Sequence, residues 1–395
     1  MQKLELSLRT LTPLWTGNIS GNSIHIRETG LLGSLRWWYE GIIRGMGGSV
    51  CDPLPEGHCE FKQEKPEPPE QQLCPACLLF GCTGWQRRFR LEVTDLEPIP
   101  LFFVASSGVY QTSGNWLWRM FGADEAGGKK QGRGSSTKFT FGVQALWGTE
   151  TKLRIIPLKA FQGNISAQLS YLLNIISKWG ALGAKTQNGF GQVIVNGLNE
   201  DLITNGCQEL KVVAASSQVN HNKNNISQNQ LKNYFDLRRF FSRIYEIGHD
   251  NPYKTAGKLI GDPCGFNYQD FFIPCAFDIR YKSRSRNPFT GQGEDFGMRP
   301  WFKNKKQYDS KATDILFGKS KARTDEDCSG GRIGVSHLYR KQRDGSFYVK
   351  IWGHVPDSLG IEPEDVAREI DMFVQTMFRG AKLRTEFKQK EALGS

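Results

Sequence analysis

Short segments in which hydrophobic and polar residues alternate recur along the first half of this chain. The first is KLELSLRTL, where Leu4, Leu6 and Leu8 alternate with polar positions. The same period of two occurs in RRFRLEV (87–93), KFTFGVQAL (138–146) and KLRIIPL (152–158). Because successive side chains of a strand point to opposite faces, each segment predicts a half-buried β-strand.

Two longer segments place their hydrophobic residues at helical spacing instead. In SLRWWYEGIIRGM (34–46), Leu35, Trp38 and Ile42 fall on one face, and NISAQLSYLLNIISKW (164–179) carries a broader apolar face. A glycine-rich loop and a closing strand, GQVIV, follow the second helix. The resulting order of strand, helix, strand, strand, helix, strand is that of the split βαβ domains, which include ferredoxin-like and RRM-like folds.

The second half of the chain shows a weaker version of the same pattern. A polar stretch at 216–229 predicts a linker or long loop. After it we expect a helix near 230–247, a strand in FFIPCAFDI (271–279), paired strands within 332–353 and a helix at 363–378 that has Pro363 in its first turn. The sequence therefore predicts an α+β protein with two ferredoxin-like (RRM-like) domains, one over residues 1–205 and a degenerate one over 206–395.

Residues 52–73 interrupt the first domain with a segment that is rich in proline and glutamate and has no hydrophobic period. A CxxC pair, Cys74 and Cys77, follows this segment. Cys51 precedes it, and His58 and Cys59 lie within it. Four such ligands form a closed tetrahedral zinc site, which would replace the apolar core that the segment lacks. We predict a zinc-binding insertion over about 51–82 with the ligands Cys51, Cys59, Cys74 and Cys77, His58 being an alternative ligand. A pair of buried thiols is the reading without metal.

The same cysteines also partly match the zinc deaminase signature H-x-E…P-C-x-x-C. His58 and Glu60 supply the first part, but Leu73 stands where the signature has proline. A zinc-dependent nucleobase deaminase is therefore kept as an alternative function.

Composition and charge restrict the class of partner. The chain has 395 residues, is 38% hydrophobic and 23% charged, and contains no apolar run long enough for a membrane helix. Its start shows an alternating strand and no signal peptide, so we expect a cytoplasmic protein with no membrane partner. Nine cysteines in that compartment favour metal ligands or buried thiols over disulfides, and a net charge of +11 favours an anionic partner such as nucleic acid.

Basic residues gather in several segments beside aromatic residues or glycines. Phosphate contacts combined with base stacking are how proteins hold single-stranded RNA, whereas a solvated surface is the alternative explanation of a charged segment. The candidate RNA-binding residues are Arg36 and Arg44, Arg87 and Arg88, Lys129 and Lys130, and Arg284 and Arg286.

The loop GALGAKTQNGFGQV has four glycines and one lysine between the second helix and the closing strand. Glycines let backbone approach a phosphate closely, so Gly180, Gly183, Gly189, Gly191 and Lys185 are candidates for an RNA contact. A glycine-rich turn between helix and strand is the alternative. The spacing differs from that of a nucleotide-binding P-loop, which also follows a strand.

Four motifs occur in one order: TPLWTGN (12–18), GLLGSLRWWYEGIIRGMGG (30–48), CPACLLFGCTGWQRRFRLEV (74–93) and GALGAKTQNGFGQV (180–193). Together they resemble the RAMP superfamily of CRISPR effector proteins and, within it, the family of subunit one of the type III-B Cmr module. The resemblance is dense over residues 1–195 and thin beyond them.

This resemblance implies paired ferredoxin-like domains, with the glycine-rich loop as the RAMP signature. It also implies a place in a multi-subunit ribonucleoprotein for antiviral defence, beside other RAMP subunits. The protein would lie near the 3′ end of the guide CRISPR RNA, with Trp15 and the Gly17–Gly21 loop near the RNA, and would help capture single-stranded target RNA.

RAMP proteins that cleave target RNA have a catalytic aspartate between the first strand and the first helix. In this chain that loop, residues 12–33, contains no aspartate, and Glu28 is its only acidic residue. We therefore predict a non-catalytic RNA-binding subunit. The alternative is a RAMP endoribonuclease acting on guide or target RNA, with His25 as general acid and base.

Overall fold

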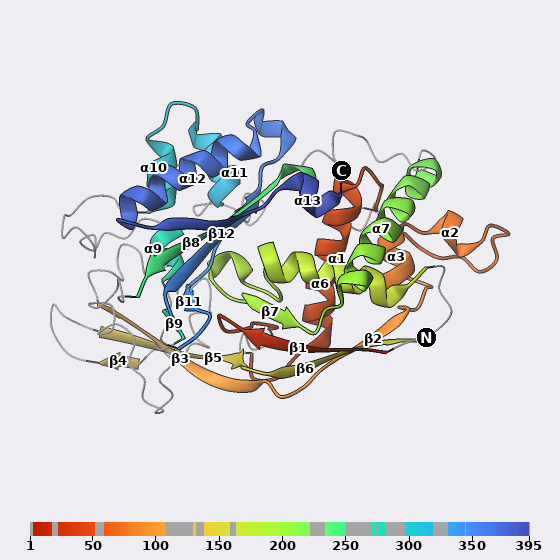
Figure 1. The fold of residues 1–395 in the computed structure, drawn as a ribbon, viewed down its shortest axis with the longest axis horizontal. Helices are drawn as coiled ribbons and strands as arrows, with labels where there is room; N and C mark the ends of the chain where they lie inside the picture. The colour runs from red at the N-terminus through yellow and green to blue at the C-terminus, as the bar shows by residue number, and fades with distance from the viewer. Residues whose placement is uncertain are drawn as a thin grey trace.

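The computed structural model of the chain describes residues 3–17, 23–51, 59–106, 129–131, 138–158, 163–221, 234–249, 271–273, 275–280, 297–318, 331–343 and 345–394. Antiparallel sheets with helices packed against them make up the described residues (Figure 1), as the α+β prediction requires. None of the described helices is both long and apolar enough to span a bilayer.

The first sheet is built from the N-terminal half of the chain. Its strands are β1 (Leu4–Thr10), β2 (Phe89–Val93), β6 (Thr151–Pro157) and β7 (Val193–Asn196), in the order β2-β6-β1-β7, and every neighbouring pair is antiparallel. Leu4, Leu6 and Leu8 of β1 are buried while the residues between them are more exposed, as their alternation predicts.

Helices α1 (Glu28–Gly45) and α6 (Ile165–Trp179) pack on the apolar side of this sheet (Figure 1). Asn164 caps α6, since its side chain accepts a hydrogen bond from the backbone N–H of Ala167. Helix α1 begins at Glu28, earlier than the hydrophobic spacing predicts. Gly30 and Gly33 are weak helix formers inside its first turns, and they hid that start.

Two insertions separate elements of this first sheet along the chain. Between α1 and β2 lie the short helices α2 (Pro69–Gln72) and α3 (Pro75–Phe80). Between β2 and β6 lie β3 (Glu97–Ser106), β4 (Lys129–Gln131) and β5 (Lys138–Trp147), which form a separate sheet in the order β3-β5-β4. The strand predicted at 138–146 is therefore confirmed, but it pairs with β3 rather than with the first sheet.

The region predicted as a linker begins as a helix. Helix α7 (Glu200–His221) packs on α6 and includes residues 216–221, so the linker prediction is wrong there, and residues 222–233 lie outside the described residues. The predicted domain boundary at 205–206 falls inside α7. Ala167 and Tyr171 approach Gly206 closely, which explains how this helix sits so tightly on α6.

The second sheet has the order β13-β8-β12-β11-β9, with β10 also paired to β12. Its strands are β8 (Phe240–Gly248), β9 (Phe272–Ile273), β10 (Ile333–Val335), β11 (Leu338–Arg340), β12 (Phe347–His354) and β13 (Lys382–Glu386). The helices and 3-10 turns of this half are η2 (Leu237–Arg239), α9 (Ala276–Arg280), α10 (Met298–Lys303), α11 (Ser310–Phe317), η6 (Asp357–Leu359), α12 (Pro363–Met377) and α13 (Gln389–Leu393).

Four predictions for this half have different outcomes. The paired strands within 332–353 and the helix that starts at Pro363 are confirmed. The helix predicted near 230–247 is wrong, because β8 is a central strand buried on both faces, where no alternation marks a strand. The strand predicted at 271–279 lasts for two residues before α9 begins.

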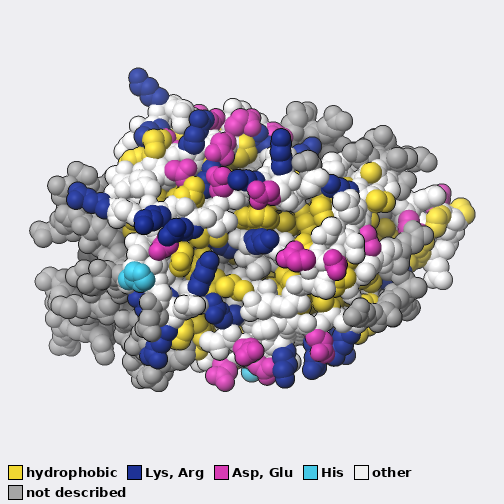
Figure 2. Space-filling model, in the orientation of Figure 1, with side chains coloured by type: hydrophobic (Ala, Val, Ile, Leu, Met, Phe, Trp, Pro, Cys, Tyr) yellow, Lys and Arg dark blue, Asp and Glu magenta, His cyan; other side chains and the backbone are white. Residues whose placement is uncertain are grey.

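The two halves interlock through their cores. Trp352 of β12 packs in the N-terminal cluster with Trp38, and Trp15 and Phe190 pack in the C-terminal cluster. The glycine-rich loop after α6, which contains the turn η1 (Thr186–Asn188), belongs to the N-terminal half and contacts the C-terminal half. On the face shown in Figure 2, acidic and basic side chains are interspersed rather than separated into one basic patch.

Candidate metal centre and nucleic-acid interface

Four cysteines meet beside α1. The sulfur atoms of Cys51, Cys59, Cys74 and Cys77 lie within 4.8 Å of one another, and all four residues are buried. The sulfurs of Cys51 and Cys77 are 3.5 Å apart. A tetrahedral zinc ion with Zn–S bonds of about 2.3 Å requires sulfurs roughly 3.8 Å apart, so the donor set fits a metal ion of this kind.

Backbone N–H groups already point at two of these sulfurs. Cys74 donates to Sγ of Cys59 at 3.3 Å, and Cys77 donates to Sγ of Cys74 at 3.5 Å from the first turn of α3. Hydrogen bonding to Cys59 lowers the pKa of the Cys51 thiol, and the reciprocal contact raises the pKa of the Cys59 thiol. Four thiols packed this closely cannot all ionise without a cation among them.

This set is complete without the alternative ligand His58, which lies outside the described residues. Four sulfur ligands fill a tetrahedral site and leave no open position for a water molecule. The four cysteines could hold a structural metal ion, and this arrangement gives no support to the deaminase alternative, which needs a metal-bound water.

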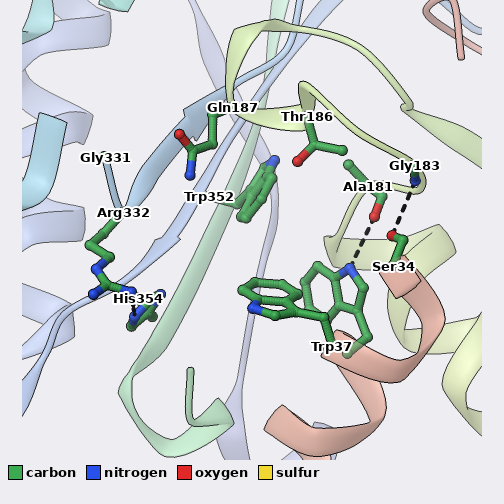
Figure 3. A pocket seen from close by; sticks show the side chains of 11 residues that line it. Ser34, Trp37, Ala181, Gly183, Thr186, Gln187, Gly331, Arg332, Trp352 and His354 are labelled. Carbon is green, nitrogen blue, oxygen red and sulfur yellow. Dashed lines mark hydrogen bonds between the residues drawn. The ribbon is translucent and has the colours of Figure 1, made fainter. Parts of the chain in front are cut away.

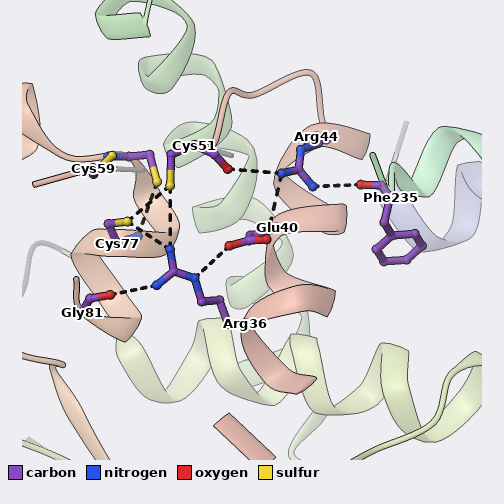
Figure 4. Close-up of polar contacts among 9 residues, drawn as sticks. Arg36, Glu40, Arg44, Cys51, Cys59, Cys77, Gly81 and Phe235 are labelled. Carbon is purple, nitrogen blue, oxygen red and sulfur yellow. Dashed lines mark hydrogen bonds and ion pairs between the residues drawn. The ribbon is translucent and has the colours of Figure 1, made fainter. Parts of the chain in front are cut away.

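Arg36 joins α1 to the cysteine cluster (Figure 4). Its guanidinium donates to Sγ of Cys77 at 3.1 Å, to the carbonyl oxygen of Gly81 at 2.8 Å and to Glu40 at 2.8 Å. Burial alone would lower the pKa of Arg36, but the charges and hydrogen bonds of Cys77 and Glu40 outweigh it and raise that pKa. The side chain thus stays cationic against sulfurs that become anionic when they bind metal.

Arg44 is directed to the same side of the helix and is 7% exposed. It donates to the carbonyl oxygens of Phe235 and Cys51, and it lies 4.0 Å from the buried Glu40. The predicted phosphate contacts of Arg36 and Arg44 stay predictions. Within the described residues, both side chains are occupied by protein partners.

The other predicted basic residues differ in what surrounds them. Arg88 stacks over the Trp85 ring at 3.8 Å, and Arg87 lies 5.7 Å from the Phe89 ring centre. No carboxylate pairs with either guanidinium in the part of the chain that the structure describes. Lys129 and Lys130 lie on β4, where only the backbone is described, and Arg284 and Arg286 lie outside the described residues.

The glycines of the loop after α6 are explained by close protein neighbours. A Cβ on Gly180 would lie 2.3 Å from the Trp38 ring, and one on Gly183 would lie 2.6 Å from the carbonyl oxygen of Trp15. One on Gly191 would lie 1.9 Å from the carbonyl oxygen of Leu182, and one on Gly189 would meet the buried imidazole of His337. These positions therefore need glycine for packing, whatever else the loop contacts.

Side chains of the C-terminal half hold this loop in place. Lys350 of β12 donates from Nζ to the carbonyl oxygen of Gly180 at 3.0 Å, and burial lowers its pKa to about 7. Arg280 donates to the carbonyl oxygen of Gln187 and to the side chain of Asn188, each at 3.3 Å. The loop is thereby fixed to the second sheet.

Lys185 has a left-handed backbone conformation, and its Nζ lies 4.1 Å from the centre of the Trp15 ring. Burial lowers the pKa of Lys185 to about 8. Trp15 itself is 1% exposed, so its ring supports Lys185 from inside the protein. An RNA contact of either residue stays a prediction.

A cavity of ≈ 510 Å³ lies where α1, the glycine-rich loop and the second sheet meet (Figure 3). Its lining residues come from all three elements: Ser34, Trp37, Trp38, Ala181, Gly183, Thr186, Gln187, Gly331, Arg332, Trp352 and His354. Sequence reasoning missed this site because its residues are distant along the chain. The available signal was Trp37, a large aromatic residue that lies outside the Leu35–Trp38–Ile42 face of α1.

Trp37 is 37% exposed, and its indole stacks on Phe235 with 3.8 Å between ring centroids and an angle of 4°. Trp38 lies edge-on to it and donates from its indole N–H to the carbonyl oxygen of Ala181 at 2.9 Å. Across the cavity, Nη1 of Arg332 lies 3.3 Å from Nε2 of His354. The cavity therefore combines flat aromatic walls with one cation.

Comparison with known proteins adds a family match. Residues 7–194 match the model of the RAMP superfamily. No curated protein sequence matches the chain. The chain is similar to the crystal structure of Cmr1 from Pyrococcus furiosus (apo form), with 13% identity and a TM-score of 0.38 over 97% of this chain and 98% of that one.

Two further solved structures show a similar degree of likeness. One is a cryo-EM structure of the type III-B Cmr-beta bound to cognate target RNA and AMPPnP, with 12% identity and a TM-score of 0.39 over 94% of this chain and 99% of that one. The other is a type IV-B CRISPR complex, with 15% identity and a TM-score of 0.31 over 49% of this chain and 90% of that one.

Proposed function

Because residues 7–194 of this chain match the model of the RAMP superfamily, we propose that the protein is an RNA-binding subunit of a type III-B CRISPR ribonucleoprotein, corresponding to subunit one of its Cmr module. The observation that carries this proposal is the family match, which covers all four ordered motifs in full. In this role the chain would lie near the 3′ end of the guide RNA in the cytoplasm, beside other RAMP subunits, and help capture target RNA.

Two finer features belong to the same proposal. We propose that each half is a ferredoxin-like domain, because the last strand of each sheet, β7 or β13, pairs beside the first, β1 or β8. We also propose that the cysteine cluster binds one zinc ion, which would fasten the 51–82 insertion to α1. Zinc supplies only structural stability there, since four thiolates saturate it.

The RNA-contacting surface would combine cations and aromatic rings. Arg87, Arg88 and Lys185 are supported by their positions against aromatic rings, and the cavity beside Trp37 opens next to the glycine-rich loop. Contacts of this kind hold single-stranded RNA with little sequence preference, because every phosphate and every base face can make them.

We propose that the subunit does not cleave RNA. Glu28 is the sole acidic residue of the 12–33 loop, and it lies in the first turn of α1, where a carboxylate stabilises the helix N-terminus. His25 is the other titratable candidate, and its backbone carbonyl oxygen accepts a hydrogen bond from Thr16. A general base needs a second group that orients it, and the loop sequence offers no convincing pair.

Affinity purification of the tagged chain from its native host tests the assignment. We expect small guide RNAs with a shared repeat-derived tag and several RAMP proteins to co-purify with it. Recovery of the chain alone, without RNA or partners, would contradict the proposal. Incubating the purified chain with labelled guide and target RNA, with and without magnesium or manganese, tests catalysis: site-specific cleavage that His25→Ala or Glu28→Ala abolishes would instead support the endoribonuclease alternative.

A further inference from the structure

We propose that the cavity between α1, the glycine-rich loop and β12 binds a single nucleotide, with its base against Trp37 and its phosphate on Arg332. The source of this nucleotide is the bound RNA strand, and that part of the inference rests on the proposed function. The cavity volume of ≈ 510 Å³ lies inside the range of about 300–1,000 Å³ that small-ligand sites occupy.

The aromatic wall is already ordered for stacking. Phe235 covers one face of the Trp37 indole, and the near-parallel contact between them fixes the ring. Trp37 lines the cavity and is still 37% exposed, which is unusual for an indole so close to a protein core. A ring held in place before binding loses little rotamer entropy when a base stacks on it.

Arg332 supplies a charge that lacks a counterion. It is half-buried, its guanidinium contacts the imidazole of His354, and no carboxylate pairs with it within the described ranges. Burial lowers its pKa, because the guanidinium loses part of its hydration. A bound phosphate would supply the missing negative charge and accept the parallel N–H bonds that a guanidinium offers.

Polar groups on the loop side complete the site. Thr186 and Gln187 both line the cavity: Thr186 lies between Trp352 and Ser34, and Gln187 lies on the other side of Trp352, toward Arg332 (Figure 3). Hydroxyl and amide groups can each donate and accept, so they suit the edge of any base. A ligand that complements this cavity has a flat ring, a negative charge and an edge that can both donate and accept hydrogen bonds. A nucleotide has all three, whereas an acidic peptide would leave the aromatic wall without a partner.

The test measures binding of a fluorescently labelled single-stranded RNA to the full-length chain by anisotropy. We expect Trp37→Ala and Arg332→Ala each to weaken binding about tenfold, and Trp37→Phe to retain most of it. Met372→Ala and Arg368→Ala, at exposed positions on α12, are matched controls and should change nothing. Thermal melting of each variant verifies that it folds.

RNAs with a single abasic nucleotide sharpen the test. One position should weaken binding to the wild-type chain, and the same position should have no further effect on Trp37→Ala. If the wild-type chain binds RNA and both cavity variants bind it equally well, the nucleotide site is wrong while the proposed function survives. If the chain binds no RNA at all, both fail. Saturation of the cavity by free nucleoside monophosphate that leaves RNA affinity unchanged would contradict the strand as source.

Discussion

Two faces of helix α1 carry the two candidate sites, and they differ in kind. The face with Arg36, Glu40 and Arg44 is closed against the cysteine cluster. The face with Ser34 and Trp37 lines the cavity at the glycine-rich loop. On this helix, the residues with the charge expected of an RNA contact point into the protein, whereas the exposed residue at the cavity, Trp37, is aromatic.

The difference shows what net charge along a helix can and cannot indicate. Three charges spaced four apart predict one common face, and the structure places them on one. The spacing does not say what that face meets. Here it meets four thiols that would need a counterion if they bound a divalent metal ion, because four thiolates would leave two negative charges uncompensated.

Removing one of the four cysteines should give the largest effect, which is the loss of bound zinc. Purified wild-type protein should carry about one zinc ion per chain, and Cys74→Ser should carry far less. In Cys74→Ser, the 51–82 segment should become sensitive to protease before the affinity of the chain for RNA is reduced. Elemental analysis and limited proteolysis check this against Cys207→Ser, a cysteine of α7 outside the cluster. Wild-type protein free of metal after chelator-free purification would refute the site.

Lys350, which contacts the glycine-rich loop beside the cavity, should make the stability of the protein depend on pH. Lys350 has a folded-state pKa of about 7 against an ordinary value of 10.5, so it is protonated in both states at acidic pH and only in the unfolded state between these values. The free energy of unfolding should therefore rise from about pH 7 toward 10.5, by roughly 2–4 kcal/mol.

Lys350→Met should remove that rise, which chemical denaturation at several pH values would measure. Lys311→Met, at an exposed lysine of α11, is the control and should keep the wild-type slope. An equal slope in wild type and Lys350→Met would show that burial does not lower the pKa of Lys350 in the folded protein.

Replacing Arg36 separates its two proposed roles. A residue that donates to metal ligands typically changes metal affinity by about 10–100-fold, so Arg36→Ala should lose zinc to a competing chelator that much more readily. RNA affinity of the zinc-loaded variant should match that of Arg90→Ala, an exposed arginine paired with Glu92 on β2. A flatter dependence of RNA affinity on salt in zinc-loaded Arg36→Ala would restore the phosphate contact predicted from sequence.

Lys185 should give the smallest effect. Its ammonium is charged below its pKa of about 8 and loses charge above it, so any attraction to phosphate should weaken as pH rises through that value. Lys185→Ala should lower the slope of log affinity against log salt by about one or less. Lys178→Ala is matched to it, because Lys178 also lies near a tryptophan ring but on α6.

Much of the first sheet could be predicted from the sequence, because β1 and β6 each bury one face and so show their period. The cysteine cluster could be predicted too, since CxxC spacing constrains the ligands locally. The central strand β8 could not, because partners on both sides remove its alternation. The cavity could not either, since Trp37, Arg332 and Trp352 meet only after the two halves pack.

We propose that RNA meets the aromatic face of α1 and not its basic face. The most direct measurement is photocrosslinking of the zinc-loaded chain to RNA that carries 4-thiouridine at single positions, followed by mass spectrometry that locates the modified residue. We expect crosslinks at Trp37 and in the 180–191 loop, and we expect them from RNAs that carry 4-thiouridine at one particular position. Crosslinks confined to Arg36, Arg44 and the 87–90 segment, with none at Trp37, would contradict it.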